Sequence, residues 1–167
     1  MKNVLVTGAG GFIGSHLVEA LVQAGKQVRA FVRYNSRNHA GHLEALPAAT
    51  ADAIELYSGD FEDARAIEKA VEGIDTVFHL GALIAIPYSY QHPVDVVQAN
   101  VLGTLNVLEA CRCDKVERVV LMSTSEVYGT AQYVPIDEAH PLQGQSPYAA
   151  TKIAADKLGE SYHLSYD

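Results

Sequence analysis

A tyrosine and a lysine four positions apart could together transfer a proton. Tyr148 and Lys152 stand in the run Tyr-Ala-Ala-Thr-Lys, and residues at this spacing share one face of a helix. A nearby ammonium favours the phenolate and lowers the pKa of the tyrosine, which makes it a usable general base. Taken alone, the pair is better explained as an exposed helix pair, so the hypothesis depends on the rest of the chain.

A second group of reactive side chains follows an apolar run earlier in the sequence. Thr124, Ser125 and Glu126 come directly after the expected strand 118–123. In open α/β sheets ligands bind at the carboxyl ends of the strands, so these hydroxyls and this carboxylate are expected at the cleft edge. Together with Tyr148, Lys152 and the glycine motif below, they predict an active site.

Three glycines near the N-terminus predict a site for a dinucleotide. Gly8, Gly11 and Gly14 follow the apolar run Val-Leu-Val and open an amphipathic segment. This pattern allows a tight turn and a close approach of backbone amides to a pyrophosphate, and a helix N-terminus favours phosphate. Phe12 and Ile13, between the last two glycines, are expected to contact the same cofactor. The alternative for the glycines alone is an ordinary turn.

The residue after the second expected strand bears on the choice of cofactor. Position 33, where an acidic group would bind a ribose hydroxyl, is Arg33, with Asn35, Ser36 and Arg37 close behind. A cation pairs with a 2′-phosphate, so NADP is predicted ahead of NAD. The alternative is that Arg33 stacks on adenine or points to solvent.

Two further strand ends contribute candidate cofactor contacts. Asp60, followed by Phe61, could accept a hydrogen bond from the adenine amino group, or could cap a helix that starts near position 62. Small residues after the fourth strand leave room for ribose and nicotinamide, and the residues predicted to contact the cofactor there are Leu80, Gly81 and Ala82. For His79 a packed, hydrogen-bonded structural role is preferred.

Strand and helix signals alternate along the whole chain and predict one α/β domain, residues 1–167. The expected strands are residues 3–7, 27–32, 53–57, 76–80 and 118–123, which form a doubly wound, Rossmann-like parallel sheet with helices on both faces. Two helical stripes are expected to be core or interface: Ile13, Leu17 and Leu21 in the first, and Val94, Val97, Val101, Leu105 and Leu108 in the second. A helix over 147–166 has no strand after it, so the fold is expected to be truncated.

Composition narrows the function classes. The chain has 167 residues, 49% of them hydrophobic, and a net charge of -8, which gives no basic surface for nucleic acid or anionic membrane. No targeting segment or membrane span is apparent, so a cytoplasmic protein is expected. Cys111 and Cys113 are expected to be reduced and to point apart. The histidines lack companion ligands, and no metal is predicted.

These motifs resemble the extended short-chain dehydrogenase/reductase superfamily, in its branch of NAD-dependent epimerases and dehydratases that act on nucleotide sugars. The resemblance includes Asn100 in Asn-x-x-Gly-Thr and the strand end Ser-Thr-Ser-Glu-Val-Tyr-Gly. It implies that Tyr148 takes the proton of the sugar 4-hydroxyl and that Thr124 binds the 4-oxygen. It also implies that Lys152 holds the nicotinamide ribose and that Asn100 belongs to the cofactor site.

Within that branch the chain is most similar to nucleotide-sugar 4,6-dehydratases, of GDP-mannose or of UDP-N-acetylglucosamine in the legionaminic acid pathway. The resemblance implies that Glu126 removes the C5 proton and that Ser125 assists departure of the 6-oxygen. The alternatives are a UDP-glucuronate decarboxylase, a C4 epimerase, and a regulatory module that binds NAD(P) without turnover.

The resemblance also implies features outside a single active site. Members of this branch continue beyond the tyrosine helix into a smaller region that grips the nucleotide sugar. The chain is therefore expected to hold the cofactor-binding half, without the substrate pocket that turnover requires. The helices 94–111 and 147–166 imply a homodimer.

Overall fold

The computed structural model describes residues 2–166, which fall into two compact units. The first unit comprises Met1–Gly81 with Asn106–Met122, and the second comprises Ala82–Leu105 with Ser123–Asp167. The chain therefore passes from one unit to the other three times. The predicted cofactor residues up to Gly81 lie in the first unit, and the predicted catalytic residues lie in the second.

The first unit is built on a five-stranded parallel sheet. The strands are β1 (Asn3–Thr7), β2 (Gln27–Arg33), β3 (Ile54–Gly59), β4 (Thr76–His79) and β5 (Arg118–Leu121). Their order is β3-β2-β1-β4-β5, and every neighbouring pair is parallel. The order reverses direction beside β1, which in open α/β sheets is where ligands bind. The predicted parallel sheet is confirmed, with strand ends shifted by two residues at most.

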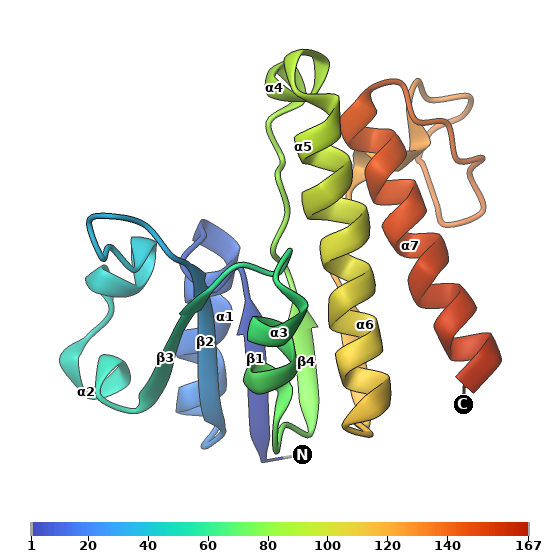
Figure 1. Cartoon of the computed structure of the whole chain (residues 1–167). Helices are drawn as coiled ribbons and strands as arrows, with labels where there is room; N and C mark the ends of the chain where they lie inside the picture. Colours follow the sequence, from blue (N-terminus) through green and yellow to red (C-terminus); the bar gives the residue numbers. More distant parts are fainter. Residues whose placement is uncertain (1, 167) are drawn as a thin grey trace. The chain divides into compact units, whose positions relative to one another are not determined.

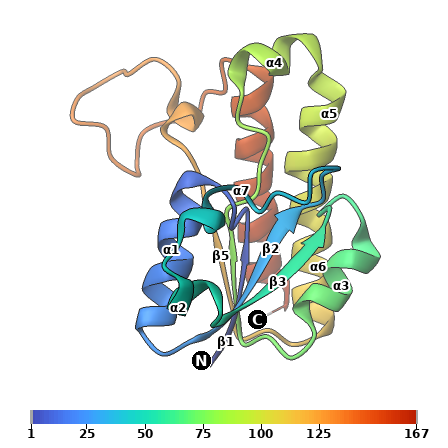
Figure 2. The ribbon, with the colours of Figure 1, turned by 90° about the vertical axis from the view of Figure 1, so that its left-hand side faces the viewer.

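Helices cover both faces of this sheet. Figures 1 and 2 show α1 (Phe12–Gln23) on one face and α3 (Ala64–Val71) with the later turns of α6 (Gly103–Cys113) on the other. The short α2 (Ala48–Ala51) follows the 3-10 turn η1 (Gly41–Ala45) on the α1 side. This is the predicted doubly wound arrangement.

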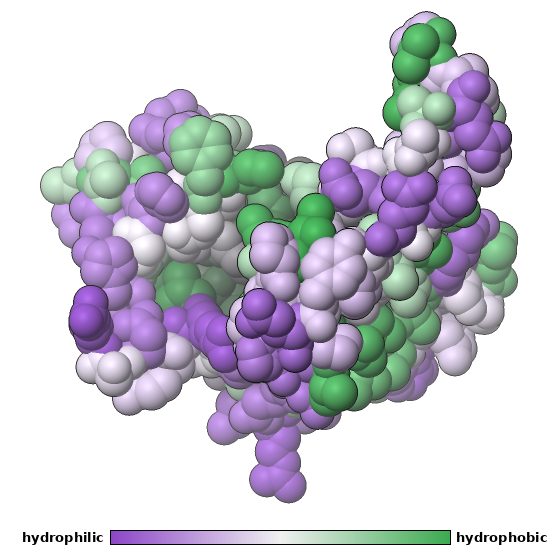
Figure 3. All heavy atoms as spheres, turned by 90° about the horizontal axis from the view of Figure 1, so that it is seen from above, coloured by the Kyte–Doolittle hydropathy of each residue, from purple (hydrophilic) through white to green (hydrophobic). Residues whose placement is uncertain are grey.

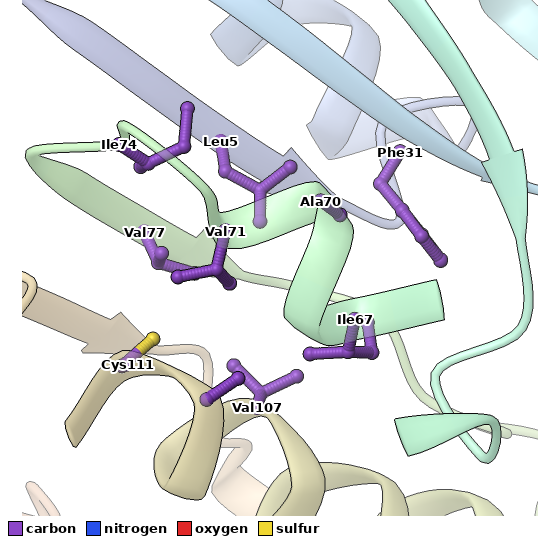
Figure 4. Close-up of a cluster of buried hydrophobic side chains, with 10 residues drawn as sticks. Leu5, Phe31, Ile67, Ala70, Val71, Ile74, Val77, Val107 and Cys111 are labelled. Atoms are coloured by element: carbon purple, nitrogen blue, oxygen red, sulfur yellow. The ribbon is translucent and has the colours of Figure 1, made fainter. Parts of the chain in front are cut away.

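Alternate strand residues supply the two cores. Leu5, Phe31 and Val77 pack with residues of α3 and α6, among them Ile67 and Val107 (Figure 4). On the other face, the residues Val4, Val6, Val28 and Ala30 pack against Val18 and Leu21 of α1. Because successive side chains of a strand point to opposite faces, one apolar strand fills both cores. Each such side chain contributes about 2 kcal/mol on burial.

One residue of the first predicted helical stripe lies outside the core. Leu17 and Leu21 contact the core, but Ile13 is 58% exposed and Val18 is fully buried. The cause is the close approach of Gly14 to the glycine turn, which points the face of Gly14 and Val18 inward. Ile13 consequently lies outside the core.

The second unit is helical. It contains α4 (Ile86–Gln91), α5 (Pro93–Val97), the π-helical turn η2 (Gln98–Leu102), the first turn of α6, the 3-10 turn η3 (Ser125–Tyr128) and α7 (Pro147–Tyr166). Figure 1 shows α5 and α7 side by side. A long connection over 129–146, without helix or strand, joins η3 to α7.

Two residues of the second predicted stripe also lie outside the core. Val94 and Val97 are 64% and 45% exposed, whereas Val96 and Asn100 are buried. The π-helical turn changes the register of the helix, since it has more residues per turn than an α-helix. The α-helical repeat that predicts the buried face before η2 therefore does not predict it after η2. Neither Val94 nor Val97 lies in a core.

The two cysteines point apart, as predicted, since Cys111 is buried and Cys113 is exposed, both as free thiols. Burial, with a smaller contribution from the charge of Asp114, raises the pKa of Cys111 to about 12.

Across residues 2–166, no helix is long and apolar enough to cross a membrane. Within the same range no group of three or more His, Cys, Asp or Glu side chains could hold a metal ion.

Candidate functional site

The glycine turn between β1 and α1 is as crowded as a dinucleotide turn requires. Gly8 has φ +67°, and a Cβ there would lie 2.8 Å from the Gly81 amide nitrogen after β4. A Cβ on Gly14 would lie 2.2 Å from the Gly8 carbonyl oxygen, which explains why α1 packs so closely on the turn. The positions that the sequence predicted for the close approach are thus glycine for a steric reason.

The N-terminus of α1 offers its own amides no side-chain partner. Gly11 is the N-cap, has extended backbone and carries no side chain, and the first turn contains no acidic residue. Helix N-termini of this kind stabilise anions. Phe12 and Ile13 follow with exposed side chains. The arrangement fits the predicted phosphates of a dinucleotide.

Gly10 and Gly41 form a contact that sequence reasoning missed. A Cβ on Gly41 would lie 2.3 Å from the Gly10 carbonyl oxygen, and a Cβ on Gly10 would lie 2.6 Å from that of Ala40. The His42 amide donates to the Gly10 oxygen at 2.9 Å. The segment after β2 therefore returns to the glycine turn. The sequence clues to this contact were Gly10, a fourth glycine in the N-terminal glycine run, and the isolated Gly41.

Arg33 ends β2 with an exposed side chain, as the NADP hypothesis requires. Its Nε lies 3.6 Å from Asp60 Oδ2, and the two side chains are 72% and 39% exposed. Asn35 is engaged within its own loop: Oδ1 accepts from the amides of Arg37 and His39, and Nδ2 donates to the His39 carbonyl at 2.8 Å. Ser36 is exposed. Asn35 thus shapes the loop, while Arg33 carries its charge.

Asp60 is not the cap of the helix that follows. Its Oδ1 accepts from the Glu62 amide at 3.0 Å, whereas Asp63 caps α3 by accepting from the amides of Arg65 and Ala66. The helix begins at Ala64, two residues later than that alternative assumed, so Asp63 takes the cap. Asp60 keeps an oxygen beside Arg33.

The end of β4 is organised by Thr7 and His79. Thr7 Oγ1 accepts from the Gly81 amide at 3.2 Å and lies 2.7 Å from His79 Nδ1. His79 is buried, and the ring of Phe61 meets it edge to face with 5.7 Å between centroids. Phe61 also lies against Gly81, where a Cβ would come within 2.9 Å of the ring. Next to them, the Leu80 amide donates to the Thr7 carbonyl. The structural role preferred for His79 agrees with these contacts.

In the second unit, Tyr148 and Lys152 lie on the first turns of α7 and are 6% and 8% exposed. The alternative of an exposed helix pair is therefore wrong. Burial lowers the pKa of Lys152, and the charge of Asp156 opposes that shift. A buried phenol and a buried amine on one helix face suit proton transfer.

Asn100 holds the backbone on two sides of this pair. Its Oδ1 accepts from the Leu83 amide at 2.7 Å, and its Nδ2 donates to the Leu83 carbonyl and to Thr151 Oγ1, each at 3.0 Å. Thr151 Oγ1 in turn donates to the Tyr148 carbonyl at 2.7 Å. Asn100 thus fixes the segment that begins with Ala82 and supports the turn of α7 between Tyr148 and Lys152. Thr151 was missed because its apparent role was only that of a spacer.

Thr124, Ser125 and Glu126 lie at the start of η3. Thr124 is the N-cap, and its Oγ1 accepts from the Glu126 amide at 3.3 Å. Ser125 and Glu126 are exposed. Large apolar side chains of the second unit are exposed as well, including Ile84, Tyr90 and Leu142. Figure 3 shows apolar residues reaching the surface among hydrophilic ones. At the start of η3, the carboxylate of Glu126 and the hydroxyls of Thr124 and Ser125 are thus available to a ligand.

Comparison with known proteins decides the family. The family model described as GDP-mannose 4,6 dehydratase matches residues 5–167. The chain belongs to the NAD-dependent epimerase/dehydratase family of short-chain dehydrogenases/reductases. Members of this family act on nucleotide sugars, and they include both 4-epimerases and 4,6-dehydratases.

Individual relatives of the family agree with this assignment. The dTDP-glucose 4,6-dehydratase of Streptomyces antibioticus is 35% identical over 98% of the chain and 50% of its own length. The UDP-N-acetylglucosamine 4-epimerase of Methanobrevibacter ruminantium, solved with UDP-N-acetylmuramic acid, has a TM-score of 0.88 and 35% identity over 99% of the chain and 51% of its own. MoeE5, solved with UDP-glucuronic acid and NAD, has a TM-score of 0.82 and 38% identity, covering 96% of the chain and 49% of its own. The chain thus spans about half the length of these relatives.

Proposed function

We propose that the protein is a nucleotide-sugar 4,6-dehydratase. Tyr148 accepts the proton of the sugar 4-hydroxyl, Lys152 stabilises the phenolate, and Thr124 hydrogen-bonds the 4-oxygen. A nicotinamide cofactor, when bound, would supply the redox chemistry as acceptor of the C4 hydride and donor of the hydride at C6. Glu126 removes the C5 proton, the 6-hydroxyl takes up a proton and leaves as water with the help of Ser125, and a proton is returned to C5 when the hydride arrives at C6. The net change is the loss of one water, with no external oxidant or reductant.

The observation that carries this proposal is Glu126. A ketone at C4 acidifies the C5 proton, so an elimination needs a base at C5. Glu126 is an exposed carboxylate two residues from Thr124, on the same short turn. A C4 epimerase returns its hydride to C4 and has no use for that base. The regulatory alternative would leave the buried Tyr148 and Lys152 without a task.

A 4-epimerase remains the second candidate, because a UDP-N-acetylglucosamine 4-epimerase is among the structures most similar to the chain. Epimerisation shares the first step, the oxidation of C4. The two reactions then diverge: a dehydratase exchanges the C5 proton, loses water and returns the hydride to C6, whereas an epimerase returns the hydride to C4. A decarboxylase of a UDP-glucuronate-like sugar would instead release carbon dioxide after the same first step.

For the cofactor, we propose NADP ahead of NAD. The exposed guanidinium of Arg33 at the end of β2 supports a contact with a 2′-phosphate. The presence of NAD in the MoeE5 structure supports the alternative. The hydroxyl of Ser36 is a further donor beside this position.

We also propose a homodimer in which the helices 94–111 and 147–166 pack against their copies. The exposed apolar side chains of Val94, Val97 and Leu164 on these helices favour burial in such an interface. Sedimentation equilibrium should give a dimer mass, and Val94→Asp with Val97→Asp should give a monomer. A monomeric wild type would reject this assembly.

The decisive experiment follows the product in deuterium oxide. The purified protein, supplied with NAD(P), is incubated with UDP-N-acetylglucosamine and GDP-mannose, and products are analysed by mass spectrometry and NMR. A dehydratase gives a 4-keto-6-deoxy sugar that has lost one water and carries solvent deuterium at C5. A product of unchanged mass inverted at C4 would identify an epimerase and reject the proposal.

Two carboxylate variants assign the C5 base. Glu126→Gln should still oxidise C4, seen as reduced cofactor in a single turnover, but should not release water. Glu138→Gln, which removes an exposed carboxylate from the 129–146 connection, should dehydrate normally. Full dehydration by Glu126→Gln would rule out Glu126 as that base.

A further inference from the structure

Asp156 and Ser123 connect α7 to the chain leaving β5, beside the proposed catalytic groups. Ser123 Oγ donates to Asp156 Oδ2 at 2.5 Å. Asp156 is half-buried and stands four residues after Lys152 in the uninterrupted helix α7. Residues at that spacing are neighbours on a helix surface. The hydroxyl thus holds the carboxylate in place one turn beyond the lysine, while Tyr148 lies one turn before it.

Lys152 needs such a partner because of its burial. Taking an ammonium out of water favours the neutral amine and lowers its pKa. A neutral amine would no longer stabilise the Tyr148 phenolate. The charge of Asp156 acts in the opposite direction and raises the pKa of Lys152. A carboxylate on the same helix therefore offsets part of the effect of burial on Lys152.

Other ionisable groups near α7 do not take this role. The ionisable groups on α7 include Tyr148 and Lys157. The elements packed against α7 carry further ones: Glu126 and Tyr128 on η3, Tyr88 and Tyr90 on α4, and His92 and Asp95 at the start of α5. Asp95 accepts a hydrogen bond from Tyr88 at 2.7 Å, and Lys157 is paired with Glu160 at 2.5 Å. Asp156 is the group whose charge acts on the pKa of Lys152.

We propose that Asp156, held by Ser123, is a positioning residue that keeps Lys152 protonated next to Tyr148. This inference rests on the proposed role of Lys152 in C4 oxidation. Asp156 acts through the lysine and does not contact substrate. Its expected effect is to extend activity to higher pH, because the reaction requires Tyr148 ionised and Lys152 charged at the same time.

The direct test measures the titration of Lys152 by NMR of ¹³Cε-labelled lysine, assigned with Lys152→Arg. In Asp156→Asn, the pKa of Lys152 should fall by about one unit. Ser123→Ala, which keeps both charges and removes only the hydroxyl, should lower it by less. Glu160→Gln, which removes an exposed carboxylate two turns further along the same helix, should leave it unchanged. An unchanged pKa in Asp156→Asn, or in Ser123→Ala if Asp156→Asn does not fold, would overturn the proposal.

A second measurement records the pH profile of C4 oxidation in a single turnover. The alkaline side of the profile should move to lower pH in Asp156→Asn, and Asp156→Glu should restore it, whereas a purely structural defect would lower the plateau at every pH. A profile that keeps its shape in Asp156→Asn contradicts the inference. A shifted Lys152 titration in a protein that oxidises no nucleotide sugar would uphold the Asp156–Lys152 coupling and reject the proposed reaction.

Discussion

The side-chain amide of Asn100 donates to Thr151 Oγ1 at 3.0 Å and so joins the π-helical turn η2 to the turn of α7 between Tyr148 and Lys152. Asn100 is 1% exposed, and its oxygen and nitrogen also bind both backbone groups of Leu83. One buried amide therefore fixes three segments of the second unit.

Replacement of Asn100 by alanine should cost about 3 kcal/mol of unfolding free energy, because backbone groups of Leu83 lose their partner in a buried environment. Urea denaturation followed by circular dichroism measures this loss. Gln98→Ala, an exposed position in the same turn, is the control and should change stability by less than about 0.5 kcal/mol. Equal losses in both variants would contradict the buried network.

Gly8 and Gly25 allow backbone strain to be separated from crowding. Both have a positive φ, +67° and +72°, but only Gly8 has neighbours within 4 Å of an added Cβ. Gly25→Ala should cost about 1 kcal/mol, from backbone conformation alone. Gly8→Ala should cost clearly more and should abolish cofactor binding, since the turn must move away from Gly81. Thermal unfolding and calorimetry test both, and similar losses would show that crowding at Gly8 is unimportant.

Arg33→Ala should weaken NADP binding about tenfold, the effect of one charge-assisted contact, and should leave NAD binding nearly unchanged. Isothermal titration calorimetry with both nucleotides measures the ratio. Lys69→Ala, at an exposed lysine of α3, is the control for loss of positive charge and should change neither affinity. If Arg33→Ala affects NAD and NADP equally, the 2′-phosphate contact is rejected.

Asp75 should make the sheet less stable in acid. Its carboxylate accepts from the amides of Asn3 and Lys2, at 2.9 and 2.6 Å, and these bonds lower its pKa. The contribution to stability is complete above the ordinary aspartate pKa of about 3.9 and is lost as the pH falls through the lower pKa of the folded state. Melting temperatures between pH 7 and pH 3 should show a smaller acid loss in Asp75→Asn than in wild type. Asp52→Asn, at an exposed carboxylate, should behave as wild type.

The parts of the fold that depend on local pattern were predictable. Each strand is a short run of β-branched or apolar residues, and the crossover helices require the parallel sheet that is observed. Tyr148 and Lys152 were predicted as partners from their helical spacing together with the glycine motif and the hydroxyl cluster. What that spacing could not give was their burial, which depends on α7 packing against α5 and η2.

Features produced by contacts between distant segments could not be predicted. The π-helical turn at Gln98–Leu102 shifts the buried face of the helix to Asn100. No residue type in that run predicts a π-helical turn. The approach of Gly41 to Gly10 joins positions thirty-one residues apart. The hydrogen bond from Ser123 to Asp156 joins positions thirty-three residues apart.

The contact between Gly10 and Gly41 has a consequence for how this protein could change its cofactor. The loop over 34–40 is anchored before it by β2 and after it by the His42 amide on the Gly10 oxygen, and Asn35 organises its interior. We expect substitutions within that interval that spare Asn35 and Ala40 to leave both anchors intact. The loop over 34–40 is therefore a place where substitutions could change nucleotide preference, by evolution or by engineering, without disturbing the sheet or the glycine turn.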